Sequence, residues 1–482
     1  MSLKGSIKAL VAARPAYDEA KAFFEGEVDE VIASQKLRKL LGDQGKHFRV
    51  NHARTPVDVM LERTEITAIT SENDNARTVC NQAWEDNQLG LEAKDIHRRA
   101  YEFGDAYLIG WSDEELPGGV SFYAHDPQEV RVFYDPQRPR VKSHAIHTWL
   151  MDSPTDESGG SYRVNVYYPD RVEQYISANE VTRPDGSKIK SIQECEWGYY
   201  VTEDSDEQGV VENPWGVIPV FHFRTDRPYG RPEHKDAYGP QNIINKTWTT
   251  LMGSVDYHGF PQRYIQTDDA VNAAPENLTP DQAMNGDATP DAQSDFDPAY
   301  LTPTGPSELW LLSGKNIKVG EFDPPEAKPL LDVIESALKQ MSSVTDIPAA
   351  RFDRSGDTPS GESYRMQDAP LNNKVTDREA QFSVTWREAL QFVLLVNDVD
   401  AIADVVWAPP ADYTDHDSWE TANEQIDAGV PAAQVLRERA YRQEDIEKWG
   451  VTEQSARTDD SPVRVTQPET RDTSGANLPA NA

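Results

Sequence analysis

The sequence predicts an α+β fold in which helical regions flank a largely antiparallel sheet. Short runs rich in β-branched and aromatic residues occur between about residues 106 and 223, and turn signals such as Pro117-Gly118-Gly119 separate them. Before and after this stretch, apolar residues recur at the spacing of one helix face. With 482 residues, the chain is long enough for more than one structural region.

The N-terminal part is predicted to be helical. An apolar stripe formed by Phe24, Val28, Val31, Ile32 and Leu37 indicates a first helix in a charged background. Two more helices follow, and Gly104 is expected to end the second of them because glycine adopts the left-handed conformation common at helix ends. Their apolar faces contain Val79, Ala83 and Trp84 in one helix and Ile96, Ala100 and Phe103 in the next.

Strand-like runs follow Gly104. Turn signals such as Asp135-Pro136 and Pro184-Asp185-Gly186 bound several of them, which favours hairpins and an antiparallel sheet. The predicted strands cover residues 106–111, 129–134, 145–151, 162–168, 172–176 and 217–223.

Beyond residue 237 the pattern returns to helical spacing. Pro240 suits the first turn of a helix of about 30 Å whose apolar stripe runs to His258. Strand candidates at 262–266, 309–312 and 317–319 then flank an insertion rich in Asp, Pro and Ala, at 268–306, that is expected to be exposed. A helix containing Leu331, Ile334, Leu338 and Met341 precedes a polar loop and the longest predicted helix, whose stripe comprises Tyr364, Leu371, Val375, Phe382, Trp386, Leu390 and Val393.

Three expectations concern the C-terminal third. Pro370 lies inside the longest helix and removes a backbone donor, so a kink is predicted there. Another helical stretch is predicted at about 416–449. The remainder, 451–482, is polar and is expected to be disordered.

Composition limits the function. The net charge of −35 argues against a protein that grips nucleic acid through a basic surface, whereas a conduit for DNA needs a wall that does not hold phosphate. Two cysteines, Cys80 and Cys195, are too few for a disulfide framework and fit a reducing compartment. No signal peptide or membrane span is predicted, so folding in a cytosol is expected.

No catalytic, metal or cofactor site is predicted. Asn316 follows Gly314-Lys315 where a phosphate-binding loop needs Ser or Thr, and no glycine lies five residues before Gly314. His144 and His147 lie three residues apart on a predicted strand, which places them on opposite faces. Ser360 is interpreted as a helix N-cap and not as a nucleophile.

Three segments occur in a characteristic order. The first is residues 83–89, Ala-Trp-Glu-Asp-Asn-Gln-Leu, followed by His97, Ala100 and residues 103–108. The second comprises residues 218–221, residues 230–233 and then Asn245-Lys246. The third comprises residues 345–352 and Ser360-Gly361-Glu362-Ser363. Over roughly residues 80–397, about two thirds of the chain, this order resembles the portal, or head-tail connector, proteins of tailed double-stranded DNA bacteriophages, of the siphovirus type.

The resemblance implies a portal-like fold with named regions. These are an outer (wing) domain, 1–234; a first stem helix, 235–258; a clip, 259–326, with the acidic insertion 268–306; a second stem helix, 327–343; a tunnel loop, 344–360; a long kinked wing helix, 361–397; a helical crown, 398–450; and the tail, 451–482.

The resemblance also implies a function without enzymatic activity or cofactors. Portal proteins form a ring, usually of twelve subunits, at one capsid vertex, through which double-stranded DNA is packaged, retained and ejected without sequence specificity. The implied partners are further copies of the chain, the terminase large subunit, head-completion or adaptor proteins, and the major capsid and scaffold proteins, but no membrane. The implied location is the virion, after assembly in the host cytoplasm.

Candidate site residues follow from this resemblance and from the apolar stripes. The DNA-channel candidates are Lys246, Lys339, Asp346, Arg351 and Arg354; the alternative for the two lysines is a solvent-facing position or an acidic partner. The candidates for packing and assembly are Trp248, Leu251, Val255, Phe382 and Trp386. Two other functions remain open: a structural capsid or adaptor component that conducts no DNA, and an acidic metal-dependent hydrolase.

Overall fold

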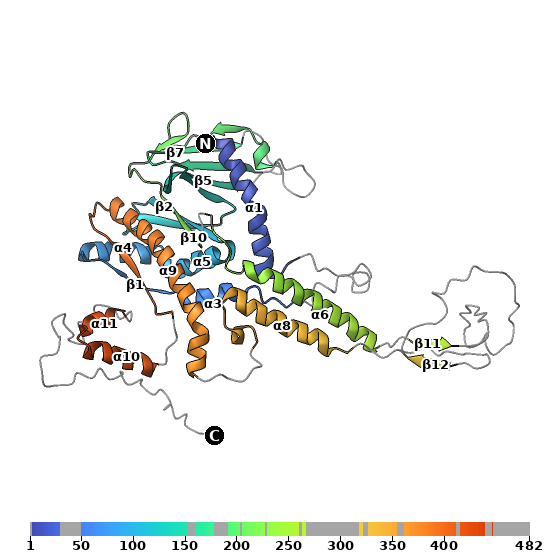
Figure 1. Ribbon diagram of the computed structural model, residues 1–482. Coiled ribbons are helices and arrows are strands. Elements are labelled where there is room, and N and C mark those ends of the chain that lie inside the picture. The colour runs from blue at the N-terminus through green and yellow to red at the C-terminus, as the bar shows by residue number, and fades with distance from the viewer. Residues whose placement is uncertain are drawn as a thin grey trace, which may run out of the picture. The chain divides into compact units, whose positions relative to one another are not determined.

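The computed structural model describes residues 2–28, 50–151, 160–177, 191–202, 205–226, 229–259, 263–266, 318–321, 326–353, 361–410, 415–438 and 446 (Figure 1). The chain divides into two compact units. The large unit comprises Met1–Glu25, Ala53–Asp236 and Ser343–Ala482, and the small unit comprises Gly26–His52 and Ala237–Ser342.

The large unit combines helices with antiparallel sheets, which confirms the α+β prediction. All strand pairs in the described part of the chain are antiparallel. The helices of this unit are α1 (Leu3–Glu25), α3 (Thr55–Arg63), α4 (Asp74–Asp86), α5 (Leu89–Phe103), α9 (Gly361–Val396), α10 (Asp415–Asp427) and α11 (Ala432–Glu438), with short 3-10 turns η2 (Ile192–Glu194), η3 (Lys235–Ala237) and η5 (Ala349–Arg351).

Two sheets form the centre of the large unit and a third lies on α9. The first has the order β10-β2-β3, the second β4-β5-β6-β7-β8 with β9 on β7, and the third β1-β13. The strands are β1 (Ile66–Thr70), β2 (Asp105–Ser112), β3 (Val120–His125), β4 (Val130–Asp135), β5 (Arg138–Met151), β6 (Ser161–Tyr167), β7 (Arg171–Ser177), β8 (Trp197–Tyr199), β9 (Val210–Glu212), β10 (Val220–Arg224) and β13 (Asp404–Trp407).

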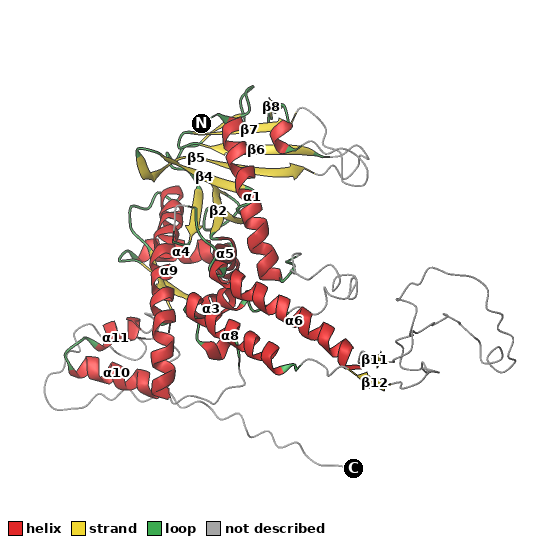
Figure 2. Cartoon of the chain, turned by 45° about the vertical axis from the view of Figure 1, so that its right-hand side comes forward, coloured by secondary structure: helices red, strands yellow, loops and turns green. Residues whose placement is uncertain are grey.

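Helix α1 covers one face of the second sheet (Figure 2). Ile7 and Leu10 of α1 pack with Phe133, Ile146 and Val164 of the strands, and these five side chains are at most 7% exposed. Burying large apolar side chains of this kind stabilises the fold by about 1.5–3 kcal/mol each. The pairing of one apolar helix face with one apolar sheet face therefore makes a core.

Glycine is required where α5 meets the start of β2. Gly104 ends α5 with a φ of +87°, as the sequence predicts. A Cβ at Gly104 would lie 2.5 Å from the backbone nitrogen of Arg231, and one at Gly230 would overlap the carbonyl of Gly104. The backbone segments at Gly104 and Gly230 thus lie so close together that neither position has room for a side chain.

Some expectations were wrong in detail. The first helix does not follow the predicted stripe through Val28, because α1 ends at Glu25 and Gly26 has a φ of +75°. Residues Val31, Ile32 and Leu37 lie outside the described residues. Strands β1, β3, β8, β9 and β13 were not predicted. In the described part of the helical stretch predicted near 416–449, α10 and α11 are separate helices with Gly429, whose φ is +99°, between them.

Other expectations agree with the structure. Strands β2, β4, β5, β6, β7 and β10 form where strand-like runs were predicted, and α9 passes through Pro370 without a break; the kink itself remains a prediction. Cys80 and Cys195 are free and buried. Among the described helices, none is both long and apolar enough to cross a membrane.

The small unit contains two helices and a hairpin. Helices α6 (Tyr238–Gly259) and α8 (Lys328–Thr345), the latter reaching into the large unit at its last residues, lie side by side in both views (Figures 1 and 2). Strand β11 (Arg263–Gln266) pairs with β12 (Lys318–Glu321). Both strands lie within or beside predicted runs, whereas the predicted strand at 309–312 and the insertion at 268–306 lie outside the described residues.

Candidate functional site

Helices α6 and α8 each bury one face. Ile244 and Leu251 of α6 are 0% and 7% exposed, and Ile334 and Met341 of α8 are 7% and 0% exposed. The side chain of Gln241 also ties residues 50–52 to α6: its Oε1 accepts from the backbone N–H of His52 at 2.8 Å, and its Nε2 donates to the carbonyl of Val50 at 2.7 Å. The helices predicted as stem elements therefore form where expected.

Both helices also carry apolar side chains that are exposed to water. Ile243 and Val255 of α6 are 43% and 55% exposed, and Leu331 and Val333 of α8 are 47% and 44% exposed. Helix faces of this kind are stabilised by a neighbouring surface that covers them. Within one chain, the described residues leave these four side chains uncovered.

The two lysine candidates differ. Lys246 lies on the exposed surface of α6. Lys339 is also exposed, but its Nζ lies 2.6 Å from Oε1 of Glu335, one helical turn earlier. This hydrogen bond raises the pKa of Lys339. Lys339 thus has an acidic partner on its own helix, and its position in a channel stays a prediction.

The segment that follows α8 is anchored. Asp346 has a φ of +59°, and α8 ends before it. The side chains of Ile347 and Phe352 are buried, which holds the segment against the rest of the large unit. Nη1 of Arg351 lies 3.0 Å from Oε2 of Glu62 on α3. Lys374 of α9 donates to the carbonyl of Thr345 at 3.1 Å. Arg354 lies outside the described residues.

The five packing candidates belong to two separate places. Phe382 and Trp386 of α9 are fully buried in the large unit, where Nε1 of Trp386 donates to Nε2 of His97 at 2.9 Å. Burial lowers the pKa of His97 to about 3, so the ring is a neutral acceptor. In the small unit Leu251 is buried, Trp248 is half-buried and Val255 is exposed.

An aromatic cluster surrounds Trp386. Its ring centroid lies 5.1 Å from that of Trp84 on α4 and 5.0 Å from that of Phe223 on β10. His97 stacks on Phe382 with 4.9 Å between ring centroids. Four elements, α4, α5, α9 and β10, therefore meet at one buried point, and Trp84 and His97 of the first resemblance segment lie there with the long helix.

A buried polar network was missed by the sequence reasoning. Asp105, at the start of β2, accepts a hydrogen bond from Tyr17 at 2.7 Å and lies 2.7 Å from Nε2 of His222. Tyr134 lies 2.8 Å from the other ring nitrogen. Burial lowers the pKa of His222 despite the neighbouring carboxylate. Because the side chains of His222 and Asp105 are each 1% exposed, the pair is closed to a substrate and acts in packing.

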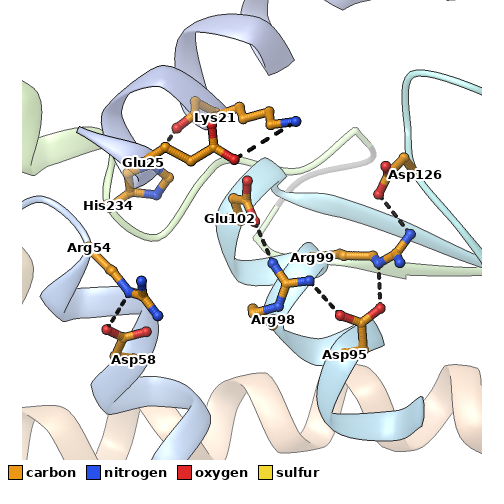
Figure 3. Close-up of polar contacts among 11 residues, drawn as sticks. Lys21, Glu25, Arg54, Asp58, Asp95, Arg98, Arg99, Glu102, Asp126 and His234 are labelled. Carbon is orange, nitrogen blue, oxygen red and sulfur yellow. Dashed lines mark hydrogen bonds and ion pairs between the residues drawn. The ribbon is translucent and has the colours of Figure 1, made fainter. Parts of the chain in front are cut away.

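Ion pairs link the helices and turns of the large unit (Figure 3). Arg99 of α5 contacts Asp95 at 2.7 Å and Asp126 at 2.8 Å, and the second contact fixes the turn between β3 and β4. Arg98 contacts Glu102 at 3.0 Å. Since most of these side chains are partly exposed, each pair contributes about 1 kcal/mol or less.

Glu379 gives a pH-dependent prediction. This α9 residue is 7% exposed, its Oε1 has no hydrogen-bond partner, and burial raises its pKa from 4.5 to about 7. A raised folded-state pKa lowers stability as the pH rises from the unfolded value through the folded value. Glu379→Gln is therefore expected to raise the free energy of unfolding by about 2–3 kcal/mol at pH ~8 and to change it little at pH ~4.5.

Urea unfolding of both proteins at the two pH values checks this result. Asp377→Asn, an exposed acid on the same helix, is the control and should change little at either pH. An equal effect of Glu379→Gln at both pH values would contradict the explanation.

His144 and His147 have different neighbours, as expected for opposite faces of β5. Nε2 of His144 lies 2.9 Å from Oγ of Ser6 on α1. The ring of His147 lies 4.2 Å from that of His125, centroid to centroid. Burial, and then His125, lower the pKa of His147 to about 3. The sequence reasoning compared His147 with the wrong histidine, since its neighbour comes from the end of β3.

Known proteins were compared with the chain. The sequence model of a family described as phage portal protein, SPP1 Gp6-like, matches residues 50–448. No curated protein sequence matches.

Three of the solved structures to which this chain is similar belong to gene transfer agent (GTA) particles. A chain in the neck of the empty particle, computed with C6 symmetry, has a TM-score of 0.44 at 11% identity, over 87% of this chain and 95% of that one. A chain in the neck of the native particle, computed with C12 symmetry, has a TM-score of 0.42 at 11% identity, over 83% and 91%. A chain in the virion of the native particle has a TM-score of 0.42 at 11% identity, over 82% and 89%.

Proposed function

Because this chain belongs to the SPP1 Gp6-like family of phage portal proteins, we propose that its copies close into a ring, usually of twelve subunits, around a channel that conducts double-stranded DNA at one capsid vertex. The match over residues 50–448 carries this proposal. A ring forms when one surface of a subunit binds a different surface of the next and the rotation closes.

The uncovered apolar side chains on α6 and α8 support contacts between subunits in the proposed stem. Ile243, Val255, Leu331 and Val333 are each more than 40% exposed in the single chain. Covering them with a neighbouring subunit would remove apolar area from water, which contributes about 25 cal/mol per Å². The proposed ring would therefore cover side chains that the described residues of one chain leave exposed.

The charges support passage of DNA without tight binding. A net charge of −35 repels phosphate over much of the surface. Two of the proposed channel cations are paired, Lys339 with Glu335 and Arg351 with Glu62. Paired cations attract phosphate less than free ones, so light contacts with DNA are proposed for Lys339 and Arg351. Lys246 and Arg354 are proposed as further channel cations, and Asp346 as a channel residue that repels phosphate.

The remaining assignments of the proposal concern partners and regions. Residues 259–326 are proposed as the clip that meets the terminase large subunit and later the head-completion proteins. The wing, 1–234 with 361–397, and the crown, 398–450, are proposed to face the capsid and scaffold proteins. The proposed location is the portal vertex of the virion, reached after assembly in the host cytoplasm.

Electron microscopy of the purified full-length chain tests the proposal. The expected result is a closed ring with a central hole of at least about 20 Å, the approximate width of a DNA duplex. A closed ring with a narrower, filled centre would favour a structural capsid component that conducts no DNA. A monomer that persists with scaffold protein present would contradict ring formation.

Charged substitutions on the stem helices test the subunit contacts. Val255→Asp and Leu331→Asp are each expected to raise the protein concentration needed for ring formation by at least about tenfold, which corresponds to about 1.4 kcal/mol per contact. Sedimentation velocity over a concentration series measures this change. Leu91→Asp on α5 is the control, because Leu91 is 73% exposed and lies outside the proposed stem. Unchanged ring formation in both stem variants would contradict the proposed interface.

A further inference from the structure

Three potential metal ligands lie together where β3 passes into β4. His125, Glu129 and His147 each present a nitrogen or oxygen atom, and these atoms all lie within 4.8 Å of one another. Nδ1 of His125 lies 3.7 Å from Oε2 of Glu129. Two ligands of a tetrahedral zinc ion with bonds of about 2.0–2.1 Å are about 3.3 Å apart, so small side-chain rotations bring the three atoms to bonding distance.

The fold holds these residues close before any ion binds. His125 is the last residue of β3, and residues 126–129 form a turn in which the N–H of Glu129 donates to the carbonyl of Asp126 at 3.0 Å. The carbonyl of Glu129 in turn accepts the N–H of Thr148 at 2.8 Å, which places it beside His147. Backbone pairing alone therefore brings together ligands from two sheets.

Neighbouring contacts fix the turn further. Arg99 pairs with Asp126 at 2.8 Å (Figure 3), and Nε of Arg14 on α1 donates to the carbonyl of Gln128 at 3.0 Å. The ring of His147 stacks on Trp149, with 4.5 Å between centroids. Ligands that are already positioned lose less conformational freedom on binding an ion.

The ligand types select the metal. Two imidazoles with one carboxylate suit zinc and similar first-row divalent ions, whereas calcium and magnesium prefer oxygen ligands. His125 and His147 are half-buried, and Glu129 is exposed. A fourth position on the solvent side is therefore open to water.

We propose that His125, Glu129 and His147 form a binding site for a zinc-like divalent ion that links the β10-β2-β3 sheet to the β4-β5 sheet. The ion bonds one ligand from the end of β3, one from the turn and one from β5. Its binding fixes the turn between the sheets and stabilises the folded chain by mass action.

Metal analysis of the purified full-length chain tests the site. The protein is stripped with a chelator, dialysed against zinc chloride at physiological ionic strength, desalted and analysed by mass spectrometry for metal content. The expected result is one zinc ion per chain, and cobalt in place of zinc should give the visible absorption of a tetrahedral complex. His125→Asn, His147→Asn and Glu129→Gln should each weaken zinc binding by at least about tenfold.

Two controls separate this site from weak binding by the acidic surface. His144 lies on the same strand as His147 but contacts α1, and Glu115 is an exposed acid in the turn before the other end of β3; His144→Gln and Glu115→Gln should both keep the ion. Zinc should also raise the melting temperature of the wild type and leave that of Glu129→Gln unchanged, and Glu129 is exposed enough for this variant to fold. Less than a tenth of an ion per wild-type chain, or full zinc content in the three ligand variants, would overturn the proposal.

Discussion

Replacing Trp386 by alanine is expected to lower the free energy of unfolding by about 3–5 kcal/mol. The indole is fully buried between α4, α5 and β10, and its N–H donates to His97. Alanine leaves a cavity that the surrounding rings of Trp84 and Phe223 cannot fill without moving, and it leaves Nε2 of His97 without its donor. Urea unfolding of the purified chain measures the loss.

The stability losses of two further variants are compared with that of Trp386→Ala. Trp386→Phe keeps an aromatic ring but removes the hydrogen bond, so its loss should be smaller than that of alanine. Tyr123→Ala removes an aromatic side chain that is 60% exposed and should change stability by about 0.5 kcal/mol or less. A loss in Trp386→Ala no greater than that in Tyr123→Ala would show that the cluster contributes little.

Glu233→Ala is expected to cost about 3–5 kcal/mol, because it leaves two cations in a buried place without their partner. The carboxylate of Glu233 contacts Nζ of Lys374 at 2.9 Å and also pairs with Nε of Arg378; all three side chains are at most 17% exposed. The two pairs hold the segment before α6 against α9. The control is Asp236→Asn, whose partner Arg231 is in the same segment but exposed, and its effect should be below about 1 kcal/mol.

The effect of Glu233 depends on pH in a defined direction. Burial alone would raise the pKa of this carboxyl, but Lys374 and then Arg378 outweigh it, so the pKa lies below its usual value. A lowered folded-state pKa gives stability that is present above the unfolded pKa and lost as the pH falls through the folded pKa. The difference between wild type and Glu233→Gln should therefore be largest near neutral pH and shrink in acid. A difference that grows in acid would refute the ion-pair explanation.

Secondary structure was predictable where buried apolar residues recur at regular spacing along one face of a helix or strand. The stripe of Ile244 and Leu251 predicted α6, and the stripe of Phe382 and Trp386 predicted α9, because burial along one helix face produces a period near four residues. Strand β13, by contrast, has only four residues and is paired with β1, more than 300 residues earlier. A short strand of this kind carries little local signal, since its partner supplies the hydrogen bonds.

The sequence was enough to choose candidate residues by their chemical type, but it did not predict which side chains surround them. The sequence predicted a helix around Lys339 and a loop around Arg351, which lies in the short turn η5. The carboxylates that pair with these two residues, Glu335 one helical turn away and Glu62 on α3, were found only in the structure. Likewise, the two potential metal ligands beside His147 come from the end of β3 and from the turn after it, and not from its own strand. Such contacts depend on strand register and turns, which side-chain spacing within one element does not specify.

The sequence by itself determined the class of fold, the main helices and, through three segments in order, the portal family. These features can be predicted from local periodicity and from motifs, because both are visible in the sequence without knowledge of long-range contacts. Only the tertiary structure decided which groups meet: the aromatic cluster around Trp386, the buried carboxylate of Glu233 and the His125, Glu129 and His147 cluster. The physical reason is that burial and electrostatics depend on distances in space, and residues far apart in the chain set those distances when the sheets and helices pack.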